Sequence, residues 1–383
     1  MANAIAFLFR FIACCCGGFS DKDPNMVNPV PYSPNIEHVD EDEAKVTQDL
    51  VDTLLGISKK TFKDSGHGLR SVHAKSHAIL YGKLNVLPNA TEYAQGLFAR
   101  PGTFDVVLRF STTPGDVLPD SVSTPRGLAI KVLDIASPEA PGIDGSKDQD
   151  FVMVNGPKFQ APNAKVFLAN LKLLAATTDR IEGVKVAASA AFQATEKALE
   201  AVGASSSTLK SLGGEPATHP LGETFFAQVP MRFGDYIAKI SVMPVAPELT
   251  ALKGHHIDTD EDPIALRKAM ISYFAFNGGV WEVRAQLCTD IDKMPVEDAD
   301  AVWPEDESPY VTVARIMVPP QEAWTDEKSI AVDDNTSFSP WHCLEAHRPL
   351  GSIMRVRKNA YEASRRFRQT HGNAETSAAH ADD

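Results

Sequence analysis

The sequence predicts an α+β protein built around an eight-stranded antiparallel β-barrel, with a helical insertion and C-terminal helices. Eight short apolar runs, rich in Val, Ile and Phe and bounded by Gly, Pro or Asp, are typical of β-strands. An Ala- and Leu-rich stretch separates the first four runs from the last four, and its composition favours helix. Two groups of antiparallel strands in one chain indicate a closed barrel, because closure removes exposed strand edges.

The order of elements follows from changes in the hydrophobic period along the chain. Val46, Leu50, Leu54 and Leu55 recur at helical spacing and predict a short amphipathic helix before the first strand. Good helix formers that lie between a Ser and a Gly predict the last helix, over 351–372. Strands are predicted over 78–86, 103–112, 126–134, 150–155, 224–234, 236–245, 280–290 and 310–319, and further helices over 164–178 and 184–202.

Composition divides the chain into three parts. Residues 1–45 are read as an apolar leader and a flexible arm, residues 46–371 as the folded domain, and residues 372–383 as a disordered tail. An eight-stranded barrel is just filled by its own side chains, so we expect a large cofactor against its outer wall. Within the folded domain we expect barrel strands over 78–155 and 224–319, the helical insertion over 162–213 and the C-terminal helical part over 321–371.

Charge and cysteine usage restrict the class of protein. A formal net charge of −13 over 383 residues argues against nucleic-acid binding, which needs a positive footprint. Three of the five cysteines are adjacent and the other two stand alone, so they form no disulfide framework. That usage is typical of a reducing compartment, and we expect a cytoplasmic protein.

The apolar N-terminus, residues 2–16, leaves two interpretations open. It contains Arg10 and is shorter than the ~20 residues that a membrane-spanning helix needs. One interpretation is a sticky, disordered leader. The other is an interfacial segment with acylated cysteines, which would give weak membrane association.

One face of the predicted last helix concentrates positive charge around a phenol. Arg357, Tyr361, Arg365 and Arg368 lie at offsets that place them in one stripe. Nearby cations favour the phenolate form of a tyrosine, and a phenolate is a hard anionic ligand suited to ferric iron. The competing interpretation is a solvated basic helix, which the stripe alone favours because charge runs are usually solvated.

Five short motifs, which follow one another along the chain, favour the iron-ligand interpretation of this helix over the solvated basic helix. They are Arg-x-x-His-Ala-Lys at 70–75, Arg-Phe-Ser-Thr at 109–112, Pro-Arg-Gly at 125–127, Asn-x-Pro at 155–157 and Arg-x-x-x-Tyr at 357–361. Together they resemble the haem catalase family, in particular its short catalase-like branch, from about residue 60 to residue 370. One departure is Ser76, which stands where the family usually has Gly after His-Ala-Lys.

The resemblance implies a role for each matched residue. Tyr361 would be the axial ligand of the iron in haem b, as in the tyrosine-ligated haem that the catalases carry. His73 would be the acid–base residue on the other side of the haem, with Ser111 orienting its ring and Asn155 polarising the bound peroxide. Arg70, Arg109 and Arg368 would pair with haem propionates, where a bidentate guanidinium is favoured over Lys. The residues assigned to cofactor binding are Arg70, Arg109, Arg357, Arg365 and Arg368.

The function implied by the resemblance is that of an oxidoreductase that decomposes hydrogen peroxide to water and dioxygen, with peroxidase activity left open. A second reading is a haem hydroperoxide isomerase or peroxygenase acting on lipid or other organic hydroperoxides. Val72 beside His73 favours the first reading, because the catalase-related allene oxide synthases usually have Thr there. A non-catalytic haem-binding barrel is the third reading. Members of the family associate, so the resemblance leaves a homo-oligomer open, and the sequence does not determine the oligomeric state.

Overall fold

A closed antiparallel barrel forms the body of the protein, as predicted. The computed structural model describes residues 28–371 except 89–90, 92, 116 and 178–213. Each strand of the ring pairs with two neighbours, in the order β1-β2-β3-β4-β5-β7-β8-β9 and back to β1, and β6 adds a short hairpin to β7. The strands are β1 (Ser76–Val86), β2 (Gly102–Thr112), β3 (Arg126–Val132), β4 (Gln149–Val154), β5 (Phe225–Phe226), β6 (Met231–Phe233), β7 (Tyr236–Pro244), β8 (Gly279–Leu287) and β9 (Val311–Val318).

Period-2 alternation sorts the strand side chains into an inner and an outer set. Leu108 and Phe110 of β2 are fully buried in the barrel core, together with Trp281 of β8. Arg109 and Ser111 alternate with them and therefore face outward. The barrel interior is thus filled by apolar side chains, and the polar residues of the sequence motifs lie on its outer wall.

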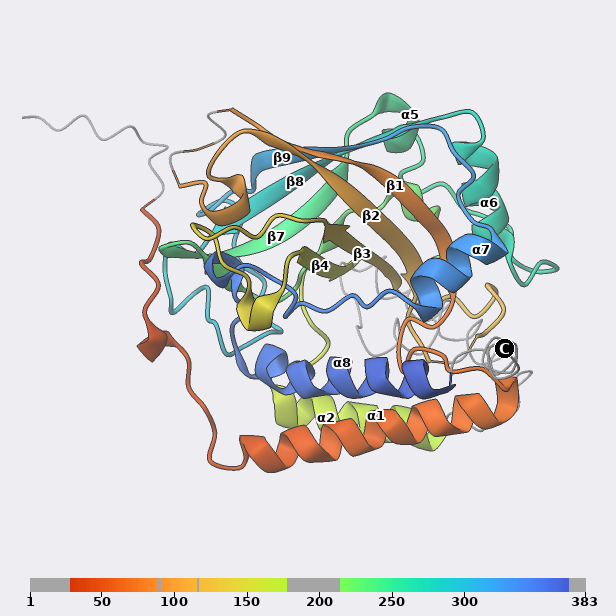
Figure 1. Cartoon of the computed structure of the whole chain (residues 1–383), viewed down its shortest axis with the longest axis horizontal. Coiled ribbons are helices and arrows are strands. Elements are labelled where there is room, and N and C mark those ends of the chain that lie inside the picture. Colours follow the sequence, from red (N-terminus) through yellow and green to blue (C-terminus); the bar gives the residue numbers. More distant parts are fainter. Residues whose placement is uncertain (1–27, 89–90, 92, 116, 178–213, 372–383) are drawn as a thin grey trace, which may run out of the picture.

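Three helices form a layer against one side of the barrel (Figure 1): α1 (Glu43–Ser65), α2 (Ala164–Thr177) and α8 (Ser352–His371). Leu50 and Leu54 of α1, Leu168 of α2, and Val356 and Ala360 of α8 pack into one apolar cluster. This cluster fixes the position of α8 relative to the barrel wall. Among the described helices, none is both long enough and apolar enough to cross a membrane.

The remaining helices are short or lie at the barrel rim. They are α5 (Pro247–Thr250), α6 (Ala265–Phe274) and α7 (Asp326–Ser329), which a π turn (Ile330–Asp334) extends. Single 3-10 turns occur at Pro34–Ile36, Gly96–Phe98, Ile143–Gly145, Pro220–Gly222 and Glu345–His347. The sequence did not predict α6.

Two predicted elements differ from the structure. The first helix of the domain extends well beyond Leu55. Gly56, which faces open space, lies within it, and Gly66 ends it in a left-handed conformation. The strand predicted over 224–234 is divided into β5 and β6, because Gln228 adopts a φ of 65° between them. Such a backbone conformation interrupts a strand.

The predicted flexible arm is ordered from residue 28 onward. The backbone N–H of Val30 donates to the carbonyl of Cys288 at 2.7 Å, and Glu37 forms an ion pair with Arg355 of α8 at 2.9 Å. This part of the arm is therefore bound to the barrel. The leader with residues 2–16, the predicted helix 184–202 and the tail 372–383 lie outside the described residues.

Candidate functional site

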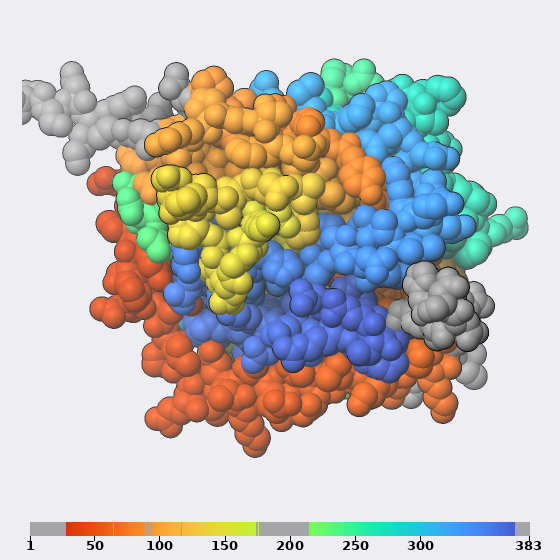
Figure 2. Space-filling view, viewed as in Figure 1, coloured from red at the N-terminus to blue at the C-terminus, as the bar shows by residue number. Residues whose placement is uncertain are grey.

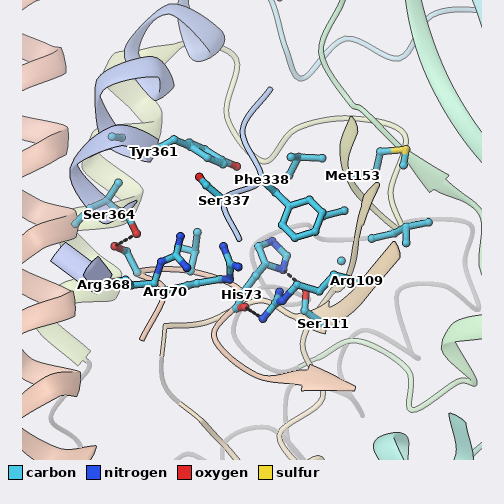
Figure 3. A pocket seen from close by; sticks show the side chains of 18 residues that line it. Arg70, His73, Arg109, Ser111, Met153, Ser337, Phe338, Tyr361, Ser364 and Arg368 are labelled. Carbon is cyan, nitrogen blue, oxygen red and sulfur yellow. Dashed lines mark hydrogen bonds between the residues drawn. The ribbon is translucent and has the colours of Figure 1, made fainter. Parts of the chain in front are cut away.

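A cavity of about 80 Å³ lies between the outer wall of the barrel and α8. Strand β2 contributes Arg109 and Ser111, the loop before β1 contributes His73, and α8 contributes Tyr361. In the view of Figure 3, Tyr361 lies above His73, and the ring of Phe338 lies beside the imidazole. The structure thus brings the predicted phenol and imidazole to one site on the outer wall.

The imidazole of His73 is held in a fixed orientation. A hydrogen bond of 3.2 Å joins its Nδ1 to the hydroxyl of Ser111. Its ring lies directly over Gly127 of β3, where an added Cβ would be 2.5 Å from Nδ1. Glycine is therefore required below the ring, and this role of the Pro-Arg-Gly motif was not recognised from the sequence.

Burial and neighbouring cations keep this imidazole neutral. Burial lowers the pKa of His73 to about 3, and the positive charges of Arg109 and Arg357 act in the same direction. Protonation of the ring is therefore disfavoured throughout the physiological range. A neutral imidazole can accept a proton from a bound molecule and return it.

Tyr361 enters the cavity from α8 with a cation on its oxygen. The Nη2 group of Arg357, one helical turn earlier, donates a hydrogen bond of 2.5 Å to the phenol oxygen. This confirms that the two residues share a face of the helix. A guanidinium in this position stabilises negative charge on the phenol oxygen.

Arg70 and Arg368 each present an unused donor. Arg70 donates through Nη2 to the carbonyls of Val332 and Thr336, both at 2.9 Å, and Arg368 donates through Nη1 to the carbonyl of Asp333 at 2.6 Å. The Nε atoms of both arginines are buried without a hydrogen-bond partner among the described residues. Orphaned buried donors of this kind are rare. Their chemistry fits the carboxylates of a cofactor.

Burial also disfavours the charged form of the Arg70 and Arg368 guanidiniums. It lowers the pKa of Arg368 to about 10, and the positive charge of Arg109 lowers it further, while Asp333 opposes the shift. Burial likewise lowers the pKa of Arg70 well below its usual value. A bound anion would relieve both effects.

Arg109 differs from these two arginines because it already has a carboxylate partner. Its Nε donates to Oδ1 of Asp333 at 2.5 Å, and both side chains are largely buried. Asp333 was missed in the sequence, where it belongs to an acidic stretch after α7 with no pattern of its own.

Asn155 and Arg365 line no part of this cavity. The side-chain carbonyl of Asn155 accepts from the backbone N–H of Arg126 at 2.9 Å, and its amide donates to Glu215 at 2.8 Å. Arg365 is exposed and lines a second hollow of about 730 Å³, which shares Tyr361 and Ser337 with the cavity. Figure 2 shows this hollow between the yellow segment before β4 and the blue α8. The roles assigned to Asn155 and Arg365 remain predictions.

Comparison with known proteins identifies the fold. No family model and no curated sequence matches the chain. Among solved structures, a fungal catalase superposes with a TM-score of 0.55 and 19% identity, covering 81% of this chain and 61% of its own. Catalase A from Saccharomyces cerevisiae gives 0.53 and 18%, covering 81% and 63%, and a bacterial catalase gives 0.53 and 16%, covering 90% and 64%.

These likenesses define a catalase-like fold. Identities of 16–19% show the shared architecture alone. The chain spans less than two thirds of the length of each of these structures.

Proposed function

We propose that this chain binds haem b and decomposes hydrogen peroxide to water and dioxygen. The observation that carries the proposal is the placement of Tyr361, with Arg357 on its oxygen, in one cavity with the neutral His73. The catalase-like fold supports it. The orphaned donors of Arg70 and Arg368 fit the two propionates of haem b.

Tyr361 would hold the ferric iron through its phenolate oxygen. The bound haem supplies the redox chemistry that cleaves the O–O bond of peroxide. Arg357 would support this role, because its guanidinium donates a hydrogen bond to the oxygen that would bind the metal.

His73 would move the proton. Its neutral ring accepts the proton of one peroxide oxygen and delivers it to the other, so that water leaves. In the net reaction, one peroxide would be reduced to two waters by the two electrons and two protons that a second peroxide gives up as it becomes dioxygen.

An oxygen electrode tests this proposal. The haem-loaded protein is expected to evolve dioxygen from hydrogen peroxide, and His73→Ala to keep its haem while losing roughly 100-fold or more of the rate. His38→Ala changes a histidine side chain that is 84% exposed, and it should leave the rate unchanged.

Failure of the haem-loaded protein to evolve dioxygen would refute the proposal. Consumption of an organic hydroperoxide in its place would establish the isomerase or peroxygenase reading. A protein that binds haem and acts on neither peroxide would be a haem-binding barrel.

A further inference from the structure

The carboxylate of Asp333 is fully used by neighbouring donors. Its Oδ1 accepts from Nε of Arg109 at 2.5 Å, and its Oδ2 accepts from the hydroxyls of Ser76 and Ser329 at 2.6 and 2.8 Å. Burial raises the pKa of Asp333, but Arg109 and Arg70 outweigh it and lower that pKa to about 2. Asp333 is therefore ionised at neutral pH and is paired with Arg109, which lines the cavity. Ser76 is one of the residues at which the sequence departs from the pattern of the family that it resembles.

The other end of the Arg109 side chain is bound to the backbone that carries His73. Its Nη2 donates to the carbonyl of His73 at 2.9 Å and to that of Ala74 at 3.2 Å. His73 has a φ of 55°, a left-handed conformation that is disfavoured for a residue with a Cβ. Hydrogen bonds from a charged donor to two successive carbonyls stabilise this conformation.

Among the described residues, two of the three arginines at the cavity have no carboxylate partner. Asp333 pairs with Arg109, whereas Arg70 and Arg368 donate to backbone carbonyls. Haem b carries two propionates. The orphaned Nε atoms belong to Arg70 and Arg368 alone among these arginines, because the Nε of Arg109 is bonded to Asp333.

We propose that Arg109 is a positioning residue for His73. Its ion pair with Asp333 keeps Arg109 from binding the carboxylates of the cofactor. Arg70 and Arg368 then bind the propionates. This inference rests on the proposed function, since it concerns how the same site divides its arginines. It replaces the expectation that all three arginines pair with propionates.

The test compares haem b with its dimethyl ester, which lacks the negative charges. Apo-protein is titrated with each porphyrin, and the ratio of the two dissociation constants measures the contribution of the carboxylates. Arg70→Gln and Arg368→Gln are expected to reduce this ratio roughly tenfold or more, as for the loss of a hydrogen bond to a charged group. Arg109→Gln removes one positive charge but no hydrogen bond to a propionate, so it should lower the ratio by less than Arg70→Gln or Arg368→Gln does. Arg366→Gln, which changes an exposed arginine of the same helix, is the control.

The variant Asp333→Asn distinguishes the positioning role of Arg109 from a merely structural role of Asp333. Removing the anion frees Arg109 and raises the local charge, so the preference for haem b over the ester should increase. At the same time the rate of peroxide cleavage should fall, because Arg109 no longer fixes the backbone of His73. A merely structural role for Asp333 would weaken both quantities together.

Arg109→Lys provides a second variant that retains the charge. A lysine has no planar fork with which to bridge Asp333 and two carbonyls. This variant should keep the wild-type ratio of dissociation constants and lose most of the peroxide cleavage.

The outcomes are distinct. The inference would be overturned if Arg109→Gln lowered the ratio of the two dissociation constants as far as Arg70→Gln does. It would also be overturned if Asp333→Asn lost both the preference for the carboxylates and the activity. A wild-type protein that binds neither porphyrin would refute the proposed function itself.

Discussion

The guanidinium of Arg357 lies on the phenol oxygen of Tyr361, with an Nη2 to Oη distance of 2.5 Å. Both residues are on α8, one turn apart, and the helix is fixed by its apolar packing on α1 and α2. Tyr361 therefore lines the cavity with its oxygen already hydrogen-bonded to a guanidinium. Such a charged donor would support an oxygen that ligates iron.

Replacement of Arg357 by Gln should weaken the binding of ferric haem. The lost hydrogen bond to a charged oxygen is worth about 1.5–3 kcal/mol, which corresponds to a roughly 10- to 100-fold higher dissociation constant. Absorbance titration of the apo-protein measures this change. Lys358→Gln removes the adjacent cation, which pairs with Asp144 at 2.6 Å outside the cavity, and should bind haem as wild type does. Equal affinities for Arg357→Gln and wild type would show that Arg357 does not support the ligand.

Replacement of Gly127 by Ala should displace the ring of His73. The added Cβ would lie 2.5 Å from Nδ1 and 2.9 Å from the hydroxyl of Ser111, which is closer than real contacts allow. We expect a loss of about 1–3 kcal/mol in the free energy of unfolding. Peroxide cleavage should fall while haem remains bound.

Chemical denaturation and oxygen evolution measure these two effects of Gly127→Ala. Gly56→Ala is the matched control, because no atom lies within 4 Å of the added Cβ. That change, in the interior of α1, should be neutral or slightly stabilising. Full activity in Gly127→Ala would show that the position of the ring is less restricted than the contact implies.

The elements and the Tyr361 helix could be predicted because they depend on local periodicity. Alternating apolar residues predict the strands, and the spacing of Arg357 and Tyr361 determines that they share a helix face. The shared cavity of Tyr361 and His73 required the resemblance to a family, because nothing local connects residues so far apart in the chain.

The rest of the site depends on tertiary contacts that leave no local pattern. Asp333 and Arg109 are 224 positions apart, so their ion pair could not be predicted from spacing. The break between β5 and β6 follows from Gln228, whose side-chain amide donates to the carbonyl of Gly156 at 3.1 Å. That contact fixes a positive φ that the apolar pattern of 224–234 gave no reason to expect.

Stability should decrease as the pH falls below the ordinary range of histidine. Burial lowers the pKa of His347 to about 4 and of His73 to about 3, and burial together with His255 lowers that of His219 to about 4. The unfolded chain has histidine pKa values of about 6.5, so it binds more protons than the folded chain between these values. The stabilisation is complete above pH ~6.5 and is lost toward pH ~4, by about 1.4 kcal/mol per pH unit for each group.

Urea denaturation at a series of pH values between 7.5 and 5 measures this slope. His347→Gln removes one of these buried histidines, to which His77, with a pKa lowered by burial, also belongs. The variant should make the slope shallower by about 1.4 kcal/mol per pH unit. An unchanged slope in that variant would show that His347 is not buried in its neutral form.

Replacement of Arg355 by Met should destabilise the protein strongly. Arg355 bridges Glu37, Glu43 and Glu297 at 2.9, 2.8 and 2.8 Å, and its side chain is 13% exposed. Removing it takes the shared cation from three neighbouring carboxylates, of which Glu37 keeps a second ion pair with Arg348 at 2.9 Å. We expect a cost of about 3–5 kcal/mol. Arg315→Met breaks a pair whose arginine is 52% exposed, and it should cost no more than about 1 kcal/mol. Equal effects of the two variants on urea denaturation would contradict this account of the arm.

The most direct test of the central claim compares haem b with metal-free protoporphyrin in wild type and Tyr361→Phe. If the phenol of Tyr361 ligates iron, the substitution will sharply lower the affinity for haem b and leave the affinity for the metal-free porphyrin unchanged. The absorbance of bound ferric haem should also shift in the variant. Equal affinities of wild type and Tyr361→Phe for haem b, with an unchanged spectrum, would contradict the claim that this residue holds the iron.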